Sequence, residues 1–327
     1  MESMKKTLVS LVIACYRSEH TVRTVVDEIA ATFEGNETYD YELLLVNDCS
    51  PDDVWSVLRD AADENEHVTA VNLAKNMGRI PALMAGFRLS RGDIVVVLDD
   101  DGQCPMDRVF DLLGPVTGET DYDVAVADYP VKKQGFFKGL GSKLNERMTR
   151  IVLEKPKDVR FNNFLAMRRY VVDEIMRYEN PYPYLTGLLL RTTRRIVNIP
   201  MEERDRLCGG TTYTLKKLVA LWMNGFTAFS VKPLRIATVF GFFTAIAGFV
   251  WGLVIVIRKI VNPAQIMAGY SSLMAVILVV GGVLMLMLGL VGEYVGRIYI
   301  SINRSPQYVV RDVYYGKLPA IRTEDDA

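Results

Sequence analysis

Apolar runs of strand length alternate with stretches of helical spacing over the first part of the chain. The strand-like runs are residues 8–14, 42–47, 68–73, 94–98 and 124–127, and the helix-like stretches between them are residues 21–33, 52–64, 80–90 and 106–113. Strands that are each followed by a helix are typical of a mostly parallel sheet with helices on both faces. The pattern therefore predicts an α/β domain.

The most apolar part of the chain lies near its end. Residues 236–257 and 271–292 contain no charged side chain, and each stretch is longer than the ~20 residues that a helix needs to cross a bilayer core. We expect two transmembrane helices joined by a loop at residues 261–270. The alternative is a buried helical hairpin in a soluble protein.

Basic residues flank these two stretches. They precede the first at Lys216, Lys217, Lys232 and Arg235, and they follow the second at Arg297, Arg304 and Arg311. Because cytoplasmic flanks are rich in Lys and Arg, we expect both ends of the chain in the cytoplasm and the short loop outside. Arg258 and Lys259, next to the loop, are exceptions to this rule.

The first apolar run has a second interpretation. Lysines followed by residues 8–15 fit a short secretion signal with lipid attachment at Cys15. The same run fits a buried parallel strand equally well. The regular order of elements that follows it favours the strand.

Composition excludes several classes of protein. The chain has 327 residues with 38 Lys and Arg against 39 Asp and Glu, a net charge of -1 that argues against a general nucleic-acid binder. It has 2 His and 4 Cys. The cysteines lie far apart, so neither a His-rich zinc site nor a disulfide framework is expected. A mean hydropathy of +0.14 beside 24% charged residues requires that the apolar residues be concentrated in one part of the chain.

Carboxylates and amides recur where the predicted strands end. Asp48 follows the second strand and Asn76 the third, while Asp99, Asp100 and Asp101 follow the fourth. Helix capping and turn formation would account for an isolated Asp or Asn. Three adjacent carboxylates repel one another unless a cation neutralises them, and oxygen ligands suit Mg²⁺ or Mn²⁺. The Gly-rich patterns of nicotinamide-binding domains and P-loop enzymes are absent.

Several segments together resemble a known family. They are VIACYRSE, LLLVNDCSPDD, NLAKNMGRIPALMAGFRLSRGDIVVVLDDDGQCP, ERDRLCGGTTYTLKKL and, after the apolar stretches, GEYVGRIYISINRSPQYVV. They resemble family 2 glycosyltransferases of the polyprenyl-phosphate type, such as dolichyl-phosphate mannose synthases and undecaprenyl-phosphate glucose or aminoarabinose transferases. The resemblance implies a GT-A (Rossmann-like) fold and inverting transfer of one sugar from a nucleotide-sugar, with UDP-hexose the expected donor. It implies that undecaprenyl phosphate is the acceptor and that the reaction takes place on the cytoplasmic face of the plasma membrane.

The resemblance also assigns residues on the donor side. It implies a nucleotide-sugar site formed by Ala14, Tyr16, Glu19, Asp48, Asn76, Gly78, Asp99 and Asp100, and an Mg²⁺ or Mn²⁺ ion held by Asp99, Asp101 and Gln103. Two positions depart from the family. Ala14 replaces the usual Pro, and Asp100 stands where Ala is common.

The acceptor side follows from the same resemblance. Lys132, Lys138, Ser142 and Arg206 are expected to bind the lipid phosphate, and Asp101, Arg206 and Asp158 to take part in catalysis. The alternative for the lysines is a solvated basic face. Here Lys replaces the Arg of the family, Tyr129 replaces another Arg, and Thr211 and Thr212 replace a Ser-Lys pair.

The expected organisation has four parts. They are a cytoplasmic catalytic domain over residues 1–212, an interfacial helix over 213–233, two transmembrane helices over 234–293, and a cytoplasmic tail over 294–327. The helix over 213–233 could equally pack within the catalytic domain. By resemblance a homo-oligomer, a tetramer, is expected. The alternatives in function are a membrane-anchored nucleotide-sugar sensor or scaffold, a processive polysaccharide synthase, whose Gln-x-x-Arg-Trp pattern is absent, and a transporter.

Overall fold

The computed structural model describes residues 6–130, 155–156, 158–205, 232–261, 270–303 and 305–316. The chain divides into two units, one formed by residues 1–217 together with 304–327, the other by residues 218–303. The strands of the first unit are β1 (Thr7–Cys15), β2 (Tyr39–Asn47), β3 (Val68–Leu73), β4 (Ile94–Leu98), β5 (Val124–Asp128), β6 (Leu165–Arg168), β7 (Ile196–Pro200) and β8 (Val310–Tyr314). Its helices are α1 (Val22–Phe33), α2 (Val54–Glu64), α3 (Arg79–Leu89), η1 (Met106–Arg108), α4 (Val109–Leu113), η2 (Gly114–Val116), α6 (Arg169–Met176) and α7 (Leu185–Thr192).

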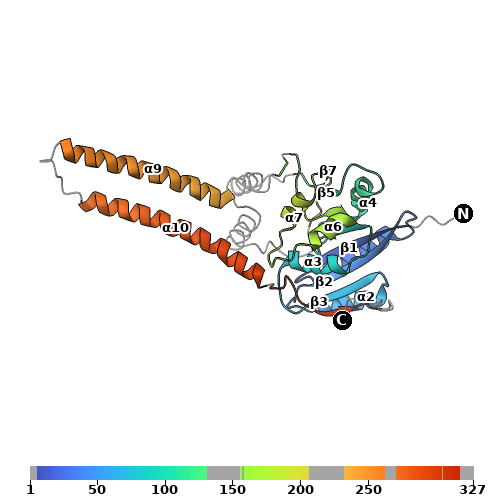
Figure 1. Cartoon of the computed structure of the whole chain (residues 1–327). Coiled ribbons are helices and arrows are strands. Elements are labelled where there is room, and N and C mark those ends of the chain that lie inside the picture. Colours follow the sequence, from blue (N-terminus) through green and yellow to red (C-terminus); the bar gives the residue numbers. More distant parts are fainter. Residues whose placement is uncertain are drawn as a thin grey trace. The chain divides into compact units, whose positions relative to one another are not determined.

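The eight strands form one sheet in the order β7-β5-β6-β4-β1-β2-β3-β8, in which Figure 1 labels the neighbours β1, β2 and β3. Strands β4, β1, β2 and β3 are parallel neighbours, and β5 is parallel to β7. Strand β6 runs antiparallel to both β4 and β5, and β8 runs antiparallel to β3. The mostly parallel α/β fold that the alternation predicts is confirmed.

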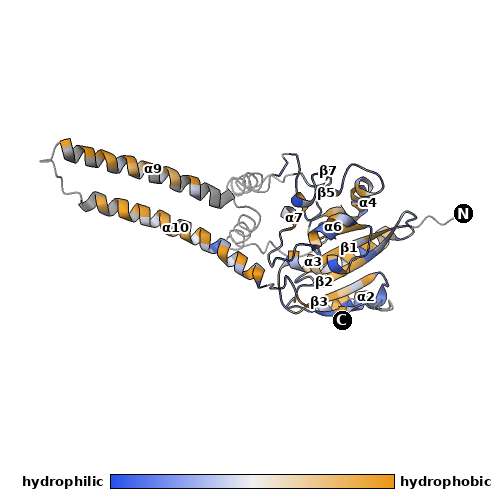
Figure 2. Cartoon of the chain, viewed as in Figure 1, coloured by the Kyte–Doolittle hydropathy of each residue, from blue (hydrophilic) through white to orange (hydrophobic). Residues whose placement is uncertain are grey.

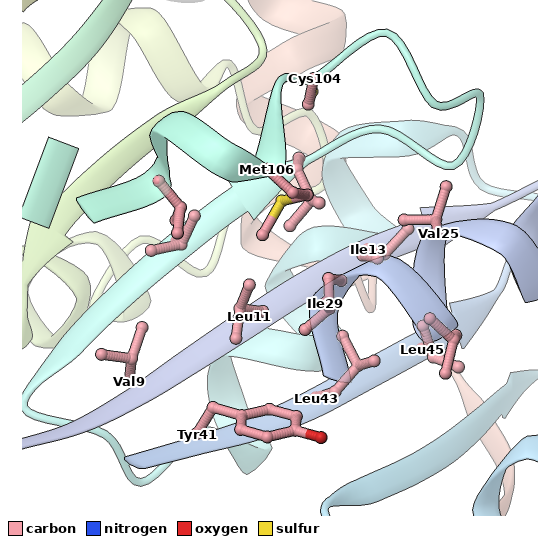
Figure 3. Packing of buried hydrophobic residues seen from close by; sticks show 14 of the residues in the cluster. Val9, Leu11, Ile13, Val25, Ile29, Tyr41, Leu43, Leu45, Cys104 and Met106 are labelled. Atoms are coloured by element: carbon pink, nitrogen blue, oxygen red, sulfur yellow. The ribbon is translucent and has the colours of Figure 1, made fainter. Parts of the chain in front are cut away.

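One face of the sheet holds the larger part of the core. Leu11 and Ile13 of β1 and Leu43 of β2 are fully buried and join Val25 and Ile29 of α1 in one cluster (Figure 3). Alternate residues of a strand point to the same face, which is why positions 11 and 13 share this cluster. Burial of each such side chain contributes about 1.5–3 kcal/mol, so this face accounts for much of the stability of the domain.

Helix α3 packs against the opposite face. Val46, Val71 and Ala82 belong to a separate cluster there. A Cβ atom placed on Gly86 would lie 2.3 Å from the Cγ1 atom of Val12. The helix therefore approaches the sheet more closely than any side chain at position 86 would permit.

The structure differs from the predicted organisation after residue 293. Helix α10 continues to Ile302, and the chain then returns to the sheet as β8 instead of forming a tail. The backbone N–H of Ala74 donates to the carbonyl of Val309 at 2.9 Å, and the Gln307 amide donates to the carbonyl of Asn180 at 2.8 Å. The unpaired edge of β3 offers backbone hydrogen bonds that this segment takes up. The boundaries at 212 and 233 stay predictions.

The second unit consists of two long helices, α9 (Lys232–Val261) and α10 (Tyr270–Ile302). They contact each other where a Cβ atom on Gly241 would lie 3.1 Å from the Cε atom of Met287. Apolar residues follow one another along both helices (Figure 2). Within the described residues, the stretch Val279–Ile302 is long and apolar enough to cross a membrane, with hydropathy 1.8, and α9 contains the shorter apolar stretch Gly241–Trp251. Two complete crossings stay a prediction.

Candidate functional site at the carboxyl edge of the parallel strands

The parallel strands deliver the predicted donor residues to one edge of the sheet. Strands β1, β2 and β4 end at Cys15, Asn47 and Leu98, and the loops that follow them are joined by hydrogen bonds. Arg17 (φ 58°) and Cys49 (φ 47°) adopt left-handed backbone conformations just beyond β1 and β2, and no other described non-glycine residue does. Such strained positions cluster at ligand-binding sites.

The loop after β1 is tied to the loop after β2. Its backbone N–H groups donate to side chains, Arg17 to Ser50 Oγ at 2.8 Å and Glu19 to Asp52 Oδ2 at 3.2 Å. In return, Glu19 accepts the N–H of Asp53 at 2.8 Å. Tyr16 remains 42% exposed beside these bonds, which leaves its ring accessible at the edge. Ala14 lies one step back, within β1, paired in register with Val46.

Asp48 braces the turn that leads into α3. Its two carboxylate oxygens accept the backbone N–H groups of Met77 and Gly78, each at 2.8 Å, and its carbonyl accepts the Asn76 amide at 3.0 Å. Burial raises the pKa of the Asp48 carboxyl in spite of these two N–H donors. Gly78 has φ 92°, a conformation that favours glycine. Asp48, Asn76 and Gly78 thus lie together, with Asp48 shaping the loop; their binding of a nucleotide-sugar stays a prediction.

The three adjacent aspartates have different partners. Asp99 Oδ1 accepts from Arg79 Nε at 2.8 Å, and its Oδ2 accepts from the Asn163 amide at 2.7 Å. Asp100 turns toward the first loop and accepts the backbone N–H of Tyr16 at 3.1 Å. Asp101 accepts the backbone N–H of Gln103 at 3.1 Å. The three carboxylates therefore point toward different partners.

The electrostatics of this triplet favour a cation. Burial, with smaller contributions from the charges of Asp99 and Asp101, raises the pKa of the Asp100 carboxyl to about 6. Burial also raises the pKa of the neighbouring Cys104 thiol, to about 12. The negative charge concentrated here is what a divalent ion would neutralise.

Gln103 is held in a fixed orientation. Its amide nitrogen donates to Glu203 Oε1 and to the carbonyl of Arg204, both at 3.2 Å, and its backbone carbonyl accepts the Arg204 N–H at 3.1 Å. Arg204 in turn forms ion pairs with Glu28 and Asp107. Because the side-chain amide nitrogen of Gln103 already donates these hydrogen bonds, the atom that would ligate a metal is the oxygen of the same side-chain amide, Oε1.

The oxygen donors of Asp99, Asp101 and Gln103 fit Mg²⁺ or Mn²⁺ in chemistry. Among the described residues, however, no three Asp, Glu, His or Cys side chains converge as metal ligands. Arg79 contacts the Asp99 carboxylate through two nitrogens, because its Nη2 also lies 2.8 Å from Oδ1. The Arg79 guanidinium is therefore the cation that neutralises Asp99 in this structure.

The predicted acceptor side falls mostly outside the described residues, as Lys132, Lys138, Ser142 and Arg206 do. Asp158 is described and exposed. Nearby, Arg160 pairs with Asp128 at the end of β5, at 3.2 Å. Tyr129 is partly buried, and burial raises the pKa of its hydroxyl.

Sequence reasoning missed four residues of this site: Arg79, Asn163, Glu203 and Arg204. Arg79 had the most direct signal in the sequence, because it follows the Asn-x-Gly turn; Glu203 and Arg204 begin the segment ERDRLCGGTTYTLKKL, but neither was assigned a role. The other three reach the edge through β6 and β7, which were not predicted as strands.

Comparison with known proteins decides the family. The model for Glycosyl transferase family 2 matches residues 10–176, and the model for the GtrB C-terminal hairpin matches residues 232–298. The chain belongs to glycosyltransferase family 2. The resemblance drawn from the motifs is confirmed at this level, and the C-terminal hairpin makes the protein membrane-associated.

Relatives align with nearly the whole chain. The undecaprenyl-phosphate 4-deoxy-4-formamido-L-arabinose transferase of Proteus mirabilis (strain HI4320) is 31% identical over 322 residues, covering 97% of each chain. The uncharacterized glycosyltransferase YkcC of Bacillus subtilis (strain 168) is 29% identical over 306 residues, covering 93% of this chain and 94% of the relative. Among solved structures, glucosyl-3-phosphoglycerate synthase from Mycobacterium tuberculosis with Mn²⁺, UDP and product aligns with a TM-score of 0.49 and 19% identity, over 66% of this chain and 76% of that one. That likeness is too weak to decide what this chain binds.

Proposed function

We propose that this glycosyltransferase transfers one sugar from a nucleotide-sugar, with UDP-hexose the expected donor, to a polyprenyl phosphate such as undecaprenyl phosphate. The reaction takes place on the cytoplasmic face of the plasma membrane and supplies a lipid-linked sugar for cell-envelope glycans. One observation carries the proposal: the hydrogen-bonded loops around Asp99, Asp100 and Asp101 occur on a chain that aligns along 97% of its length with a transferase named for undecaprenyl phosphate.

The donor side follows from the geometry of the loops. The exposed ring of Tyr16 offers a surface on which a base stacks, and Glu19 holds the loop in place through the N–H of Asp53. The Asp48 brace keeps the turn at Gly78 open to a ligand, because no side chain extends from that position. These residues bind and orient the donor.

The metal side uses the oxygen donors of the loop after β4. Asp99, Asp101 and Gln103 would hold Mg²⁺ or Mn²⁺, which supplies neutralisation of the charge that develops on the leaving diphosphate. The amide contacts of Gln103 with Glu203 and Arg204 fix its carbonyl oxygen in direction. A preorganised ligand loses little freedom when the ion binds.

The reaction needs no strong base. An oxygen of the acceptor phosphate attacks the anomeric carbon, the bond from that carbon to the diphosphate breaks, and its electron pair leaves on the β-phosphate oxygen. A phosphate monoester has a second pKa near ~6 and is largely ionised at neutral pH. The expected role of Lys132, Lys138, Ser142 and Arg206 is to offset the repulsion between the anionic acceptor and donor. Asp158 stays a candidate catalytic residue.

A donor screen tests the proposal. The purified full chain in detergent is mixed with undecaprenyl phosphate and a panel of labelled nucleotide-sugars, with Mg²⁺, with Mn²⁺ or with chelator, and label in the organic phase is counted. Metal-dependent transfer from one donor is the expected result. Binding of nucleotide-sugar without transfer from any donor would contradict the proposal and favour a sensor.

Removal of the Asp101 carboxylate is expected to abolish transfer. Because the metal and the leaving diphosphate depend on this group, Asp101→Ala should lower kcat by at least ~100-fold, with no change in thermal unfolding. The matched control is Asp111→Ala, since Asp111 pairs only with its helix neighbour Arg108 among the described contacts. Full activity in Asp101→Ala would remove the metal assignment.

A further inference from the structure

The ion pair between Arg79 and Asp99 lies at the centre of the candidate site. Both Nε and Nη2 of Arg79 lie 2.8 Å from Asp99 Oδ1. The two side chains are 27% and 25% exposed, so water screens the pair only in part. A charge-assisted contact of this kind is stronger than an exposed surface ion pair.

The position of Arg79 in its own helix is unusual. It is the first residue of α3, and the first turn of that helix contains no acidic residue. The positive end of a helix dipole favours an anion, so a cation at this place is destabilising without a negative partner nearby. Asp99 is that partner in this structure.

One nitrogen of the Arg79 guanidinium lacks an aligned hydrogen bond. Nη2 of Arg79 is buried and makes no aligned hydrogen bond with any described residue, although it lies close to Asp99 as an ion pair. Buried N–H groups are nearly always hydrogen-bonded in proteins. Its N–H groups are therefore available for a second anion at this edge.

We propose that Arg79 competes with the divalent metal ion for Asp99, and that the diphosphate of the donor relieves this competition by accepting the guanidinium. The inference rests on the proposed function only in taking Asp99 as a metal ligand. A divalent ion bound to the Asp99 carboxylate would lie close to the Arg79 guanidinium, and two cations repel each other strongly in a partly buried site. A diphosphate supplies a new negative partner for the guanidinium that the ion displaces.

This arrangement couples metal binding to donor binding. The metal alone must displace Arg79 from Asp99 without compensation, and it therefore binds weakly. With the diphosphate present, the displaced guanidinium gains a new partner, and the metal binds tightly. By linkage, the factor by which UDP strengthens metal binding equals the factor by which the metal strengthens UDP binding.

The experiment measures Mn²⁺ binding to the purified full chain in detergent, from the electron paramagnetic resonance signal of free Mn²⁺, with and without UDP. In Arg79→Gln the competing charge is gone, so the affinity for Mn²⁺ alone should rise about fivefold to tenfold, and the strengthening by UDP should shrink by a similar factor. Arg79→Lys keeps the charge and should stay close to the wild type. Arg177→Gln removes an exposed arginine that pairs with Glu174 and should change nothing.

Two results would overturn the inference. They are an unchanged or weaker affinity for Mn²⁺ alone in Arg79→Gln, with thermal unfolding like that of the wild type, and an undiminished effect of UDP in that variant. Asp99→Asn should lose most Mn²⁺ binding, which establishes that the signal comes from this site. Because Mn²⁺ binding is read without any sugar transfer, failure of the donor screen and failure of this inference are separate outcomes.

Discussion

Two apolar helices of this chain have opposite surroundings. In α3 every residue from Pro81 to Phe87 is buried in the sheet domain. In α10, apolar side chains are exposed, among them Leu284 at 60% and Leu288 at 66%. Both helices are apolar, so hydropathy alone does not say whether protein or lipid covers a helix. The sheet covers α3, whereas α10 belongs to the membrane-associated hairpin and leaves its apolar side chains exposed.

A charge placed in each helix should show this difference most strongly. Leu83 is fully buried, and Leu83→Asp would bury an unpaired carboxylate at a cost above about 4 kcal/mol. We expect that variant to lose its cooperative thermal unfolding. Leu288→Asp should leave the sheet domain folded in detergent and weaken membrane insertion by about 2.5–3.5 kcal/mol.

Near-ultraviolet circular dichroism in detergent reports the fold of these two variants, and alkaline extraction of membranes reports their insertion. A folded Leu83→Asp variant, or a Leu288→Asp variant that stays fully in the membrane, would break the contrast between the helices.

Glycine substitutions should sharpen the comparison with a smaller effect. At Gly86 an added Cβ atom would lie 2.3 Å from Val12, a stiff β-branched side chain. Gly86→Ala should therefore lower the free energy of unfolding by about 1–3 kcal/mol, because the tightly packed face must shift. At Gly281 a Cβ atom meets nothing within 4 Å, so Gly281→Ala should have no destabilising effect. Urea unfolding of the detergent-solubilised variants measures both, and equal stabilities would show that α3 has room to move.

The smallest effect concerns the segment after α10, which belongs to the sheet domain. Gln307 is 8% exposed, and its amide donates to the carbonyls of Tyr178 and Asn180. Gln307→Ala should cost about 1 kcal/mol, because a buried side chain loses its hydrogen bonds to two carbonyls. Arg311→Ala, at an exposed position four residues on, is the control and should cost less than about 0.5 kcal/mol. If both variants melt at the wild-type temperature, this segment does not stabilise the domain.

Much of the catalytic domain was predictable because its strands are buried on both faces. Such strands appear as short continuous apolar runs, and β1 to β5 were all found in this way. The gathering of the candidate donor residues at one edge was also predictable, since the carboxyl ends of parallel strands meet at one edge of a sheet. Strand β8 was not, because it contains Arg311 and Asp312 and pairs at the sheet edge with β3, far away in the sequence.

Partners of the site residues could not be predicted for a related reason. Asn163 reaches Asp99 because β6 is antiparallel to β4, with Leu165 in register with Val97, and the residues before Leu165 therefore pass the end of β4. Arg204 reaches Gln103 because β7 is parallel to β5 and brings the residues after Pro200 to the same edge. A strand order cannot be read from local patterns.

The sequence by itself determined which segments are apolar and whether their apolar residues have the spacing of a strand or of a helix. It also determined which oxygen-bearing residues follow each strand, because these features depend on neighbours along the chain. Only the tertiary structure decided that Arg79 contacts Asp99, that α3 is covered by the sheet, and that the chain returns to β3 after the hairpin. Each of these depends on residues far apart in the sequence, and packing and hydrogen bonding select among such pairings only once the whole sheet has formed.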